Sequence, residues 1–137
     1  GQTMGVEGGI KDVYLIDIPL FSNRLVTVLQ SGGINNLQCF DGGVRQPDGT
    51  LHLSYQAVNI VGLVACADLN RSIFLPGNHP PLMEFRKLVI STKKAVGHEF
   101  FRLYEDCSII VSERIKTLIE SGNFEGFTLT PLETSDD

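Results

Sequence analysis

Three cysteines and three histidines are the side chains of this sequence best suited to nucleophilic or metal chemistry. They are Cys39, Cys66, Cys107, His52, His79 and His98. A catalytic cysteine needs its thiolate beside a histidine, and a zinc site needs ligands at short, regular spacings. No cysteine is adjacent to a histidine in the sequence, and neither a CxxC nor an HExxH motif occurs. We therefore expect no catalytic residue, no metal ligand and no cofactor, and we interpret the protein as not an enzyme.

One alternative keeps ligand chemistry open. His52, His98 and the adjacent Glu99 would line a pocket in a small-ligand-binding domain or an enzyme of unknown chemistry. Convergent polar groups in a deep cleft would favour this hypothesis.

A twelve-residue segment that occurs twice indicates the elements that organise the fold. Residues 21–32 return without a gap as residues 111–122, and both serines, the arginine, the threonine and the glycine are identical. Ser22 and Ser112 are placed to cap the first turn of a helix. Apolar residues follow at positions i, i+3 and i+4, so each copy predicts a short helix between two strands. Gly32 and Gly122 are predicted to end these helices in a left-handed conformation.

Arg24 and Arg114 occupy the same position in the two copies. One interpretation is a pair of anion-binding arginines. The other is a pair of surface helices whose arginines cover an apolar edge and meet a carboxylate. The duplication favours the second, because duplicated scaffolds share structural residues.

The whole sequence predicts an α+β fold, with a mostly antiparallel sheet and two short helices in a duplicated strand–helix–strand unit. We expect a single domain over residues 1–137, with a loose glycine-rich segment at 1–9 and a frayed acidic tail at 132–137. Alternation over residues 51–57 predicts a half-buried strand with Leu51 and Leu53 on its buried face. The apolar run 57–67 fits either a fully buried strand or a buried helix, which periodicity does not separate. We favour a strand, in which Gly62 would mark a bulge or a close approach of the backbone.

Charge and cysteine usage limit the partners and the compartment. Sixteen acidic residues against eleven basic ones give a formal net charge of -5, which is the wrong sign for a nucleic-acid-binding protein. No apolar stretch is long enough to cross a bilayer, so we expect no membrane partner. An odd number of cysteines without paired spacing predicts free thiols and a cytoplasmic location.

The segment 68–84 is the strongest candidate for a functional surface. It is long, contains several prolines and carries apolar side chains, a combination that fits protein recognition better than catalysis. The alternative is a loop that closes over its own core. The candidate partner-binding residues are Phe74, Leu75, His79, Leu82 and Met83.

Two stretches of the sequence resemble landmarks of a known family. The first is residues 55–68, and the second combines residues 101–104 and 109–115 with Gly126, Phe127 and Pro131. These motifs are similar to those of an immunity-protein family of bacterial polymorphic toxin systems, formerly a domain of unknown function. Members of that family tend to be longer at the N-terminus, which implies that this chain is the C-terminal part of a longer protein.

The resemblance implies a non-enzymatic protein that binds and neutralises a cognate toxin in the cytoplasm of the producing bacterium. It brings no catalytic residue, and landmark residues such as Asn59, Asp68 and Arg102 look like fold determinants. The residues that determine which toxin is bound should therefore lie in loops. A further alternative is a structural or assembly module that uses its sheet edges. The toxin, its chemistry, the interface and the oligomeric state stay open.

Overall fold

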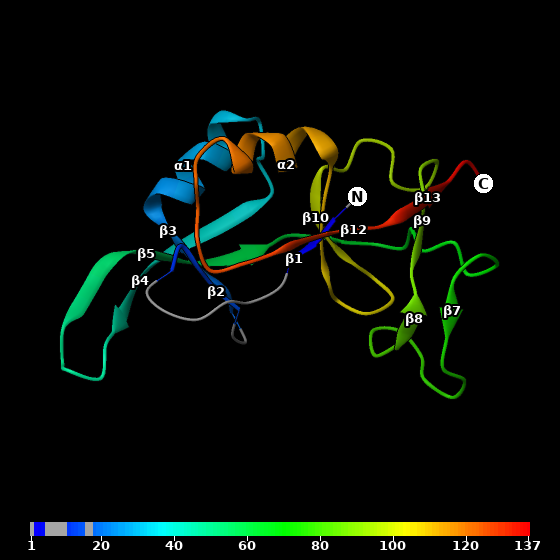
Figure 1. Cartoon of the computed structure of the whole chain (residues 1–137), viewed down its shortest axis with the longest axis horizontal. Helices are drawn as coiled ribbons and strands as arrows, with labels where there is room; N and C mark the ends of the chain where they lie inside the picture. The colour runs from blue at the N-terminus through cyan, green and yellow to red at the C-terminus, as the bar shows by residue number, and fades with distance from the viewer. Residues whose placement is uncertain (1, 5–10, 16–17) are drawn as a thin grey trace.

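The computed structural model describes residues 2–4, 11–15 and 18–137, with only the backbone at 2–4. Two short helices, α1 (Asn23–Ser31) and α2 (Glu113–Glu120), contact each other and lie on one side of the strands (Figure 1). The fold is α+β and mostly antiparallel sheet, as predicted. Of the predicted loose N-terminus, residues 1 and 5–9 lie outside the described residues, whereas Gln2–Met4 form strand β1.

Both helices begin as the duplicated sequence predicts. The hydroxyl oxygen of Ser22 accepts a hydrogen bond from the Leu25 amide at 3.2 Å, and that of Ser112 accepts one from the Ile115 amide at 3.3 Å. The apolar stripes of both helices face inward. Their most deeply buried members are Leu25, Leu29, Ile115 and Ile119.

The predicted helix ends are wrong by one residue. The left-handed residues are Gly33, with φ +94°, and Asn123, with φ +51°, which are the positions after Gly32 and Gly122. A side chain at Gly32 would overlap Leu118 of the opposite helix, and one at Gly122 would overlap the Phe124 ring. Close packing against these side chains, and not backbone handedness, therefore favours glycine at the two repeated positions.

Two four-stranded antiparallel arrangements support the helices. The first has the order β2-β3-β5-β4, formed by β2 (Val13–Tyr14), β3 (Leu20–Ser22), β5 (Leu51–Ile60) and β4 (Leu37–Arg45). The second has the order β10-β11-β1-β12, formed by β10 (Phe100–Leu103), β11 (Ile109–Val111), β1 and β12 (Leu129–Pro131). A short parallel strand, β6 (Leu63–Val64), extends the second sheet beyond β10.

The two sheets share strand order and register. In the first, Gln56 of β5 pairs with Phe21 and Asp41. In the second, Gln2 of β1 pairs with Val111 and Pro131, which are the repeat equivalents of those two residues. The duplication therefore extends well beyond the twelve similar residues, and β1 takes the place in the second sheet that β5 holds in the first.

The main hydrophobic core joins both halves between the helices and the sheets. Phe21 of β3 and Phe100 of β10 meet there edge to face, with ring centroids 6.1 Å apart. A second core lies on the far side of the second sheet. It is built from Cys66, Ala67, Ile90, Phe101, Leu103 and Ile110.

The remaining strands lie at the end of the molecule that carries the C-terminus (Figure 1). They are β7 (Ile73–Phe74), β8 (Phe85–Lys87), β9 (Val89–Ser91) and β13 (Glu133–Ser135). β13 pairs in parallel with β9, so the expectation of a frayed acidic tail is wrong for Glu133–Ser135. This pairing is made between distant segments, which local sequence patterns do not predict.

Two further expectations about the middle of the chain need correction. Leu51 and Leu53 lie on β5 as predicted, but they are 47% and 71% exposed, so that part of the strand turns its apolar side to solvent. The apolar run 57–67 is not one strand. It turns at Gly62, which has φ +97°, and continues as the short strand β6.

Candidate partner-binding surface

The segment 68–84 folds into the strand β7 and an irregular return that leads to β8. Phe74 of β7 pairs with Phe85 of β8, and their rings meet edge to face at 5.9 Å. The Leu75 amide donates to the Glu84 carbonyl at 3.0 Å, and the Leu82 amide donates to the His79 carbonyl at 2.8 Å. The segment is thus ordered by its own backbone hydrogen bonds.

The structure separates the five candidate residues by exposure. Leu82 is 74% exposed, Phe74 is 37% exposed and His79 is also exposed, whereas Leu75 is half-buried. Met83 is only 7% exposed, and its amide donates to the Glu105 carbonyl at 3.0 Å. Met83 therefore fastens the segment to the body and offers little surface to a partner.

Two exposed apolar residues add to this region. Ile73 on β7 is 55% exposed, and Leu69 at the start of the segment is 45% exposed. Leu69 follows the apolar run 57–67 and Asp68. In such a run, periodicity does not show which residues are buried and which are exposed.

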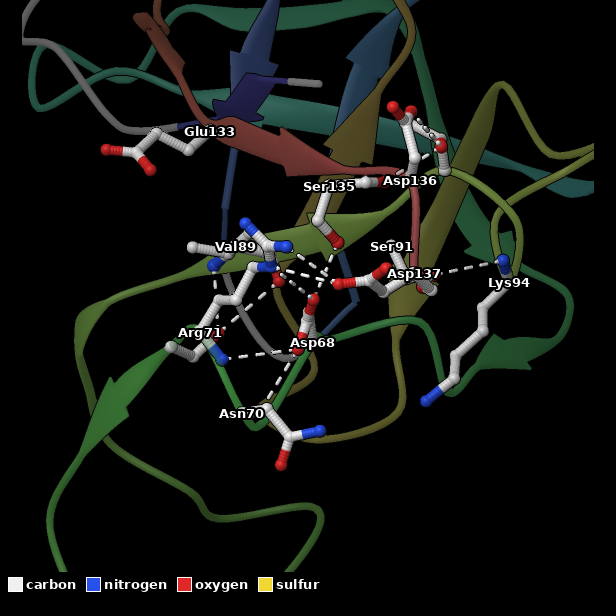
Figure 2. Close-up of polar contacts among 12 residues, drawn as sticks. Asp68, Asn70, Arg71, Val89, Ser91, Lys94, Glu133, Ser135, Asp136 and Asp137 are labelled. Carbon is white, nitrogen blue, oxygen red and sulfur yellow. Dashed lines mark hydrogen bonds and ion pairs between the residues drawn. The ribbon is translucent and has the colours of Figure 1, made fainter.

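Asp68 anchors the start of the segment (Figure 2). Its carboxylate is buried, and it accepts hydrogen bonds from the Ser135 hydroxyl at 2.6 Å and from the Asn70 and Arg71 amides at 3.1 and 3.2 Å. The Ser135 hydroxyl, followed by these amides, holds the pKa of Asp68 below its ordinary value. Asp68 stays ionised and ties the segment to β13.

Arg71 links the same segment to the end of the chain. Its guanidinium pairs with the Asp137 carboxylate at 2.8 Å and lies 3.6 Å from that of Asp68 (Figure 2). The Ser91 hydroxyl donates to the Asp137 carbonyl. Residues that the sequence analysis assigned to a loose tail therefore help to fix the base of the candidate surface.

Two buried groups that can lose a proton lie close together next to the segment: the carboxyl of Glu105 and the thiol of Cys66. Glu105 accepts a hydrogen bond from the Ala67 amide at 2.9 Å, and burial raises its pKa. Burial, followed by the nearby Glu105, raises the pKa of Cys66 to about 12. A thiol with that pKa is protonated at neutral pH, so Cys66 is unsuited to act as a nucleophile. The three cysteines, all within the described residues, are free thiols.

The duplicated arginines cap each other's helices. Arg24 donates to the Gly122 carbonyl at 2.5 Å, stacks on Phe124 and pairs with Asp12 at 3.4 Å. Arg114 reciprocates in the other half: it donates to the Gly32 carbonyl at 2.7 Å and pairs with Glu99 at 2.6 Å. Both arginines thus meet a carboxylate and the C-terminal end of the opposite helix, where a positive charge is favourable. This is the structural role that the repeat favours.

The residues of the alternative ligand pocket do not converge. His98 and Glu99 line a cavity of about 380 Å³ beside Gly33 and Asn36. His52 lies on the β4–β5 hairpin, where its ring nitrogen is 3.0 Å from the Gln46 side-chain oxygen. Glu99 is engaged by Arg114, which lowers the pKa of Glu99 and keeps it ionised.

Among the residues that the structure describes, no three His, Cys, Asp or Glu side chains lie close enough to hold a metal ion. Neither described helix is long and apolar enough to span a membrane.

Comparison with known proteins identifies the family. No curated protein shows significant similarity to the chain. The sequence model of the Immunity protein family (Imm11) matches residues 11–134, which is nearly the whole chain. That match includes both helices and every strand from β2 to β12. It also includes Glu133 and Thr134 of β13, whereas β1 lies outside it. The chain therefore belongs to the Immunity protein family (Imm11).

Proposed function

We propose that this protein binds a cognate protein toxin in the bacterial cytoplasm and neutralises it by occupying its surface, without catalysis. Family membership over residues 11–134 is the observation that carries this proposal. Immunity proteins of this kind are generally non-enzymatic. Two features agree with that role: the thiol of Cys66 is held protonated, and both duplicated arginines are engaged within the fold.

The segment 69–82 is the proposed toxin-binding surface. It presents Leu82, Ile73, Leu69 and Phe74 at 37–74% exposure, on a backbone that internal hydrogen bonds already order. Exposed apolar side chains on an ordered segment lose little conformational entropy when they bind. His79 is a polar candidate at the same surface.

Charge should contribute only modestly to this association. Glu133, Asp136 and Asp137 supply three of the five net negative charges, so the rest of the chain carries only about -2. Arg71 within the segment and Lys87 after it are paired with Asp137 and Glu133. We therefore expect the affinity to fall gently with salt, because so small a net charge steers a toxin only modestly.

A binding titration with matched variants tests this surface. Leu82→Ala should weaken toxin binding by more than about 2 kcal/mol, close to thirtyfold, as truncation of an interface anchor commonly does. Phe74→Ala should weaken it as well. Val96→Ala is the control, because Val96 is 73% exposed in the 92–97 turn, outside the segment, and matches Leu82 in exposure.

Thermal melts of the same variants separate binding from folding. Leu82 is mostly in solvent, so its variant should melt like the wild type, whereas Phe74→Ala also loses its contact with Phe85. Unchanged affinity in both variants would move the toxin surface to another part of the molecule. Unchanged affinity with a lowered melting temperature for Phe74→Ala would support a segment that only closes over its own core.

A further inference from the structure

The two halves of the molecule carry equivalent acidic sites at the starts of their helices. Asp12 and Glu99 each immediately precede the strand that pairs with the duplicated segment, in the same register. The carbonyl of each accepts the amide of a capping serine, at 2.6 Å from Ser22 and 2.8 Å from Ser112. Each carboxylate also accepts that serine's hydroxyl, at 2.7 and 3.3 Å, and pairs with the duplicated arginine of its own half. The two sites are therefore true counterparts.

In the first half a main-chain segment closes the site. The loop that follows α2 places Glu125 against Asp12: the Glu125 amide donates to the Asp12 carboxylate at 2.7 Å, and the Asp12 amide donates to the Glu125 carbonyl at 2.8 Å. A Cβ atom at the next residue, Gly126, would stand 2.8 Å from the Val13 carbonyl oxygen and 2.4 Å from the Lys11 side chain. The loop and the strand are thus in direct contact.

In the second half the equivalent loop encloses a cavity instead. Asn35 and Asn36 stand in the ungapped repeat where Glu125 and Gly126 stand in the other copy. Asn36 reaches the strand through its side chain, whose amide donates to the Phe100 carbonyl at 2.9 Å. A cavity of about 380 Å³ lies between this loop, the start of β10 and residues 61–64. Ligand pockets usually have volumes of about 300–1,000 Å³.

The polar groups that close the first site lack those partners in the second. Within the described part of the chain, no hydrogen bond joins Asn35 to Glu99, and the backbone N–H of neither residue donates to another group. The Glu99 carboxylate is held by Arg114 and Ser112, without the main-chain donor that Asp12 has. The groups missing at Glu99 are therefore the N–H and the C=O of one residue, and main-chain groups of this kind seek hydrogen-bond partners.

We propose that this cavity receives an extended main-chain segment of the cognate toxin. One toxin residue donates its N–H to the Glu99 carboxylate and accepts the Glu99 N–H with its carbonyl, as Glu125 does for Asp12. Its side chain lies against Val61 and Leu63, which line the cavity at 47% and 55% exposure, so an apolar residue fits best. In such recognition the main chain supplies affinity and the side-chain pocket supplies specificity.

This inference rests on the proposed function and gives the toxin a second contact beside the 69–82 segment. Val64 at the cavity wall is five residues before Leu69, so their Cα atoms lie at most about 18 Å apart. A standard interface covers about 800 Å² on each partner, which is a disc about 32 Å across. The cavity and the segment therefore fit within the width of one toxin interface.

Residue-by-residue amide hydrogen exchange tests the assignment on the wild-type chain. In the free chain the Glu99 amide should exchange fast, whereas the Asp12 amide, bonded to Glu125, should exchange slowly. With saturating cognate toxin, exchange at Glu99 should slow by about tenfold or more, and exchange at Asp12 should not change. Equal exchange at Glu99 in the free chain and in the saturated complex overturns the proposal.

A pair of tryptophan variants gives a second test. Val61→Trp places a large side chain at the cavity wall and should weaken toxin binding by about tenfold or more. Leu51→Trp is the matched control: it lies at the other end of β5, is also 47% exposed and should bind like the wild type. Thermal melts should show that both variants fold. Equal affinities of the two variants contradict the proposal.

Failure of this inference is distinguishable from failure of the proposed function. If the chain neutralises the toxin while exchange at Glu99 and binding by Val61→Trp stay unchanged, the cavity is not a toxin site and the proposed function stands. If the chain forms no complex with its cognate toxin, the proposed function is wrong, and this inference falls with it.

Discussion

At the scale of single residues, Asp68 shows how a buried charge positions the segment proposed for toxin recognition. Its carboxylate collects the Ser135 hydroxyl and two backbone amides, so it holds the start of the 68–84 segment against strand β13. The Met83 amide, bound to the Glu105 carbonyl, holds the other end. Between these two fixed points the side chains of Ile73 and Leu82 are left in solvent.

The lowered pKa of Asp68 makes stability depend on acid pH. Because the folded pKa lies below the ordinary value of 3.8, the unfolded chain binds this proton more readily than the folded one. The stabilising contribution is therefore complete above about pH 3.8 and is lost as the pH falls through the folded pKa. Urea unfolding from pH 7 to pH 2 measures it.

Ser135→Ala removes the largest cause of this shift and should reduce the loss of stability in acid. Thr134→Ala, at the neighbouring exposed position, should keep the wild-type pH dependence and serves as the control. The same acid dependence in Ser135→Ala and the wild type would contradict the role assigned to Asp68.

The environment of Cys66 predicts which thiol fails to react. Cys66 is fully buried beside Glu105 and has a pKa near 12, so it should resist a thiol reagent in the native protein at neutral pH. In denatured, unreduced protein we expect three free thiols. Cys66→Ser should lower the denatured count by one and leave the native reaction unchanged. A variant that loses its fastest-reacting thiol would show that Cys66 is accessible.

At the scale of elements, the duplicated helices were largely predictable from sequence. Serine caps and the i, i+3, i+4 stripes are local signals, and they placed α1 and α2 correctly. The C-terminal ends were missed by one residue, because Gly32 packs closely against Leu118 across the fold and the left-handed residue is Gly33. No local pattern reveals a constraint set by a side chain that distant in sequence.

The same dependence on residues distant in the sequence explains the other differences between the predictions and the structure. The period of β5 was recognised, but which of its faces is covered depends on the second core, which serves only the other half. The strand β13 depends on parallel pairing with β9 and on the Asp68 network. Composition made the 68–84 segment a candidate, which stays a prediction, whereas the burial of Met83 depends on its contact with Glu105 and has no local signal.

The corrected helix ends give a direct test of the duplicated unit. Gly33 has φ +94°, so Gly33→Ala should lower the free energy of unfolding by about 1–2 kcal/mol. Gly33→Asn should cost less, because asparagine tolerates this region and Asn123 occupies the equivalent position with φ +51°. Chemical denaturation measures both, with the exposed Gln30→Ala as a control. Equal costs for the two variants would argue against the equivalence of the helix ends.

At the scale of the whole molecule, two pseudo-symmetric halves share one core, and reciprocal arginine caps hold their helices together. The symmetry is broken on the outer side. One sheet is covered by the second core and the strands around it, which carry the proposed toxin surface, whereas Phe40, Leu51 and Leu53 of the other sheet are exposed. The proposed toxin surface therefore belongs to elements that only one of the two halves carries.

The central claim is that this chain neutralises a toxin by binding it and not by chemistry. An inhibition titration, in which the activity of a cognate toxin is followed as the chain is added, tests it most directly. We predict that activity falls in proportion to the added chain and ends at one chain per toxin, with no dependence on incubation time after mixing. Activity that persists at excess chain, or that disappears progressively at far less than one chain per toxin, would contradict the claim.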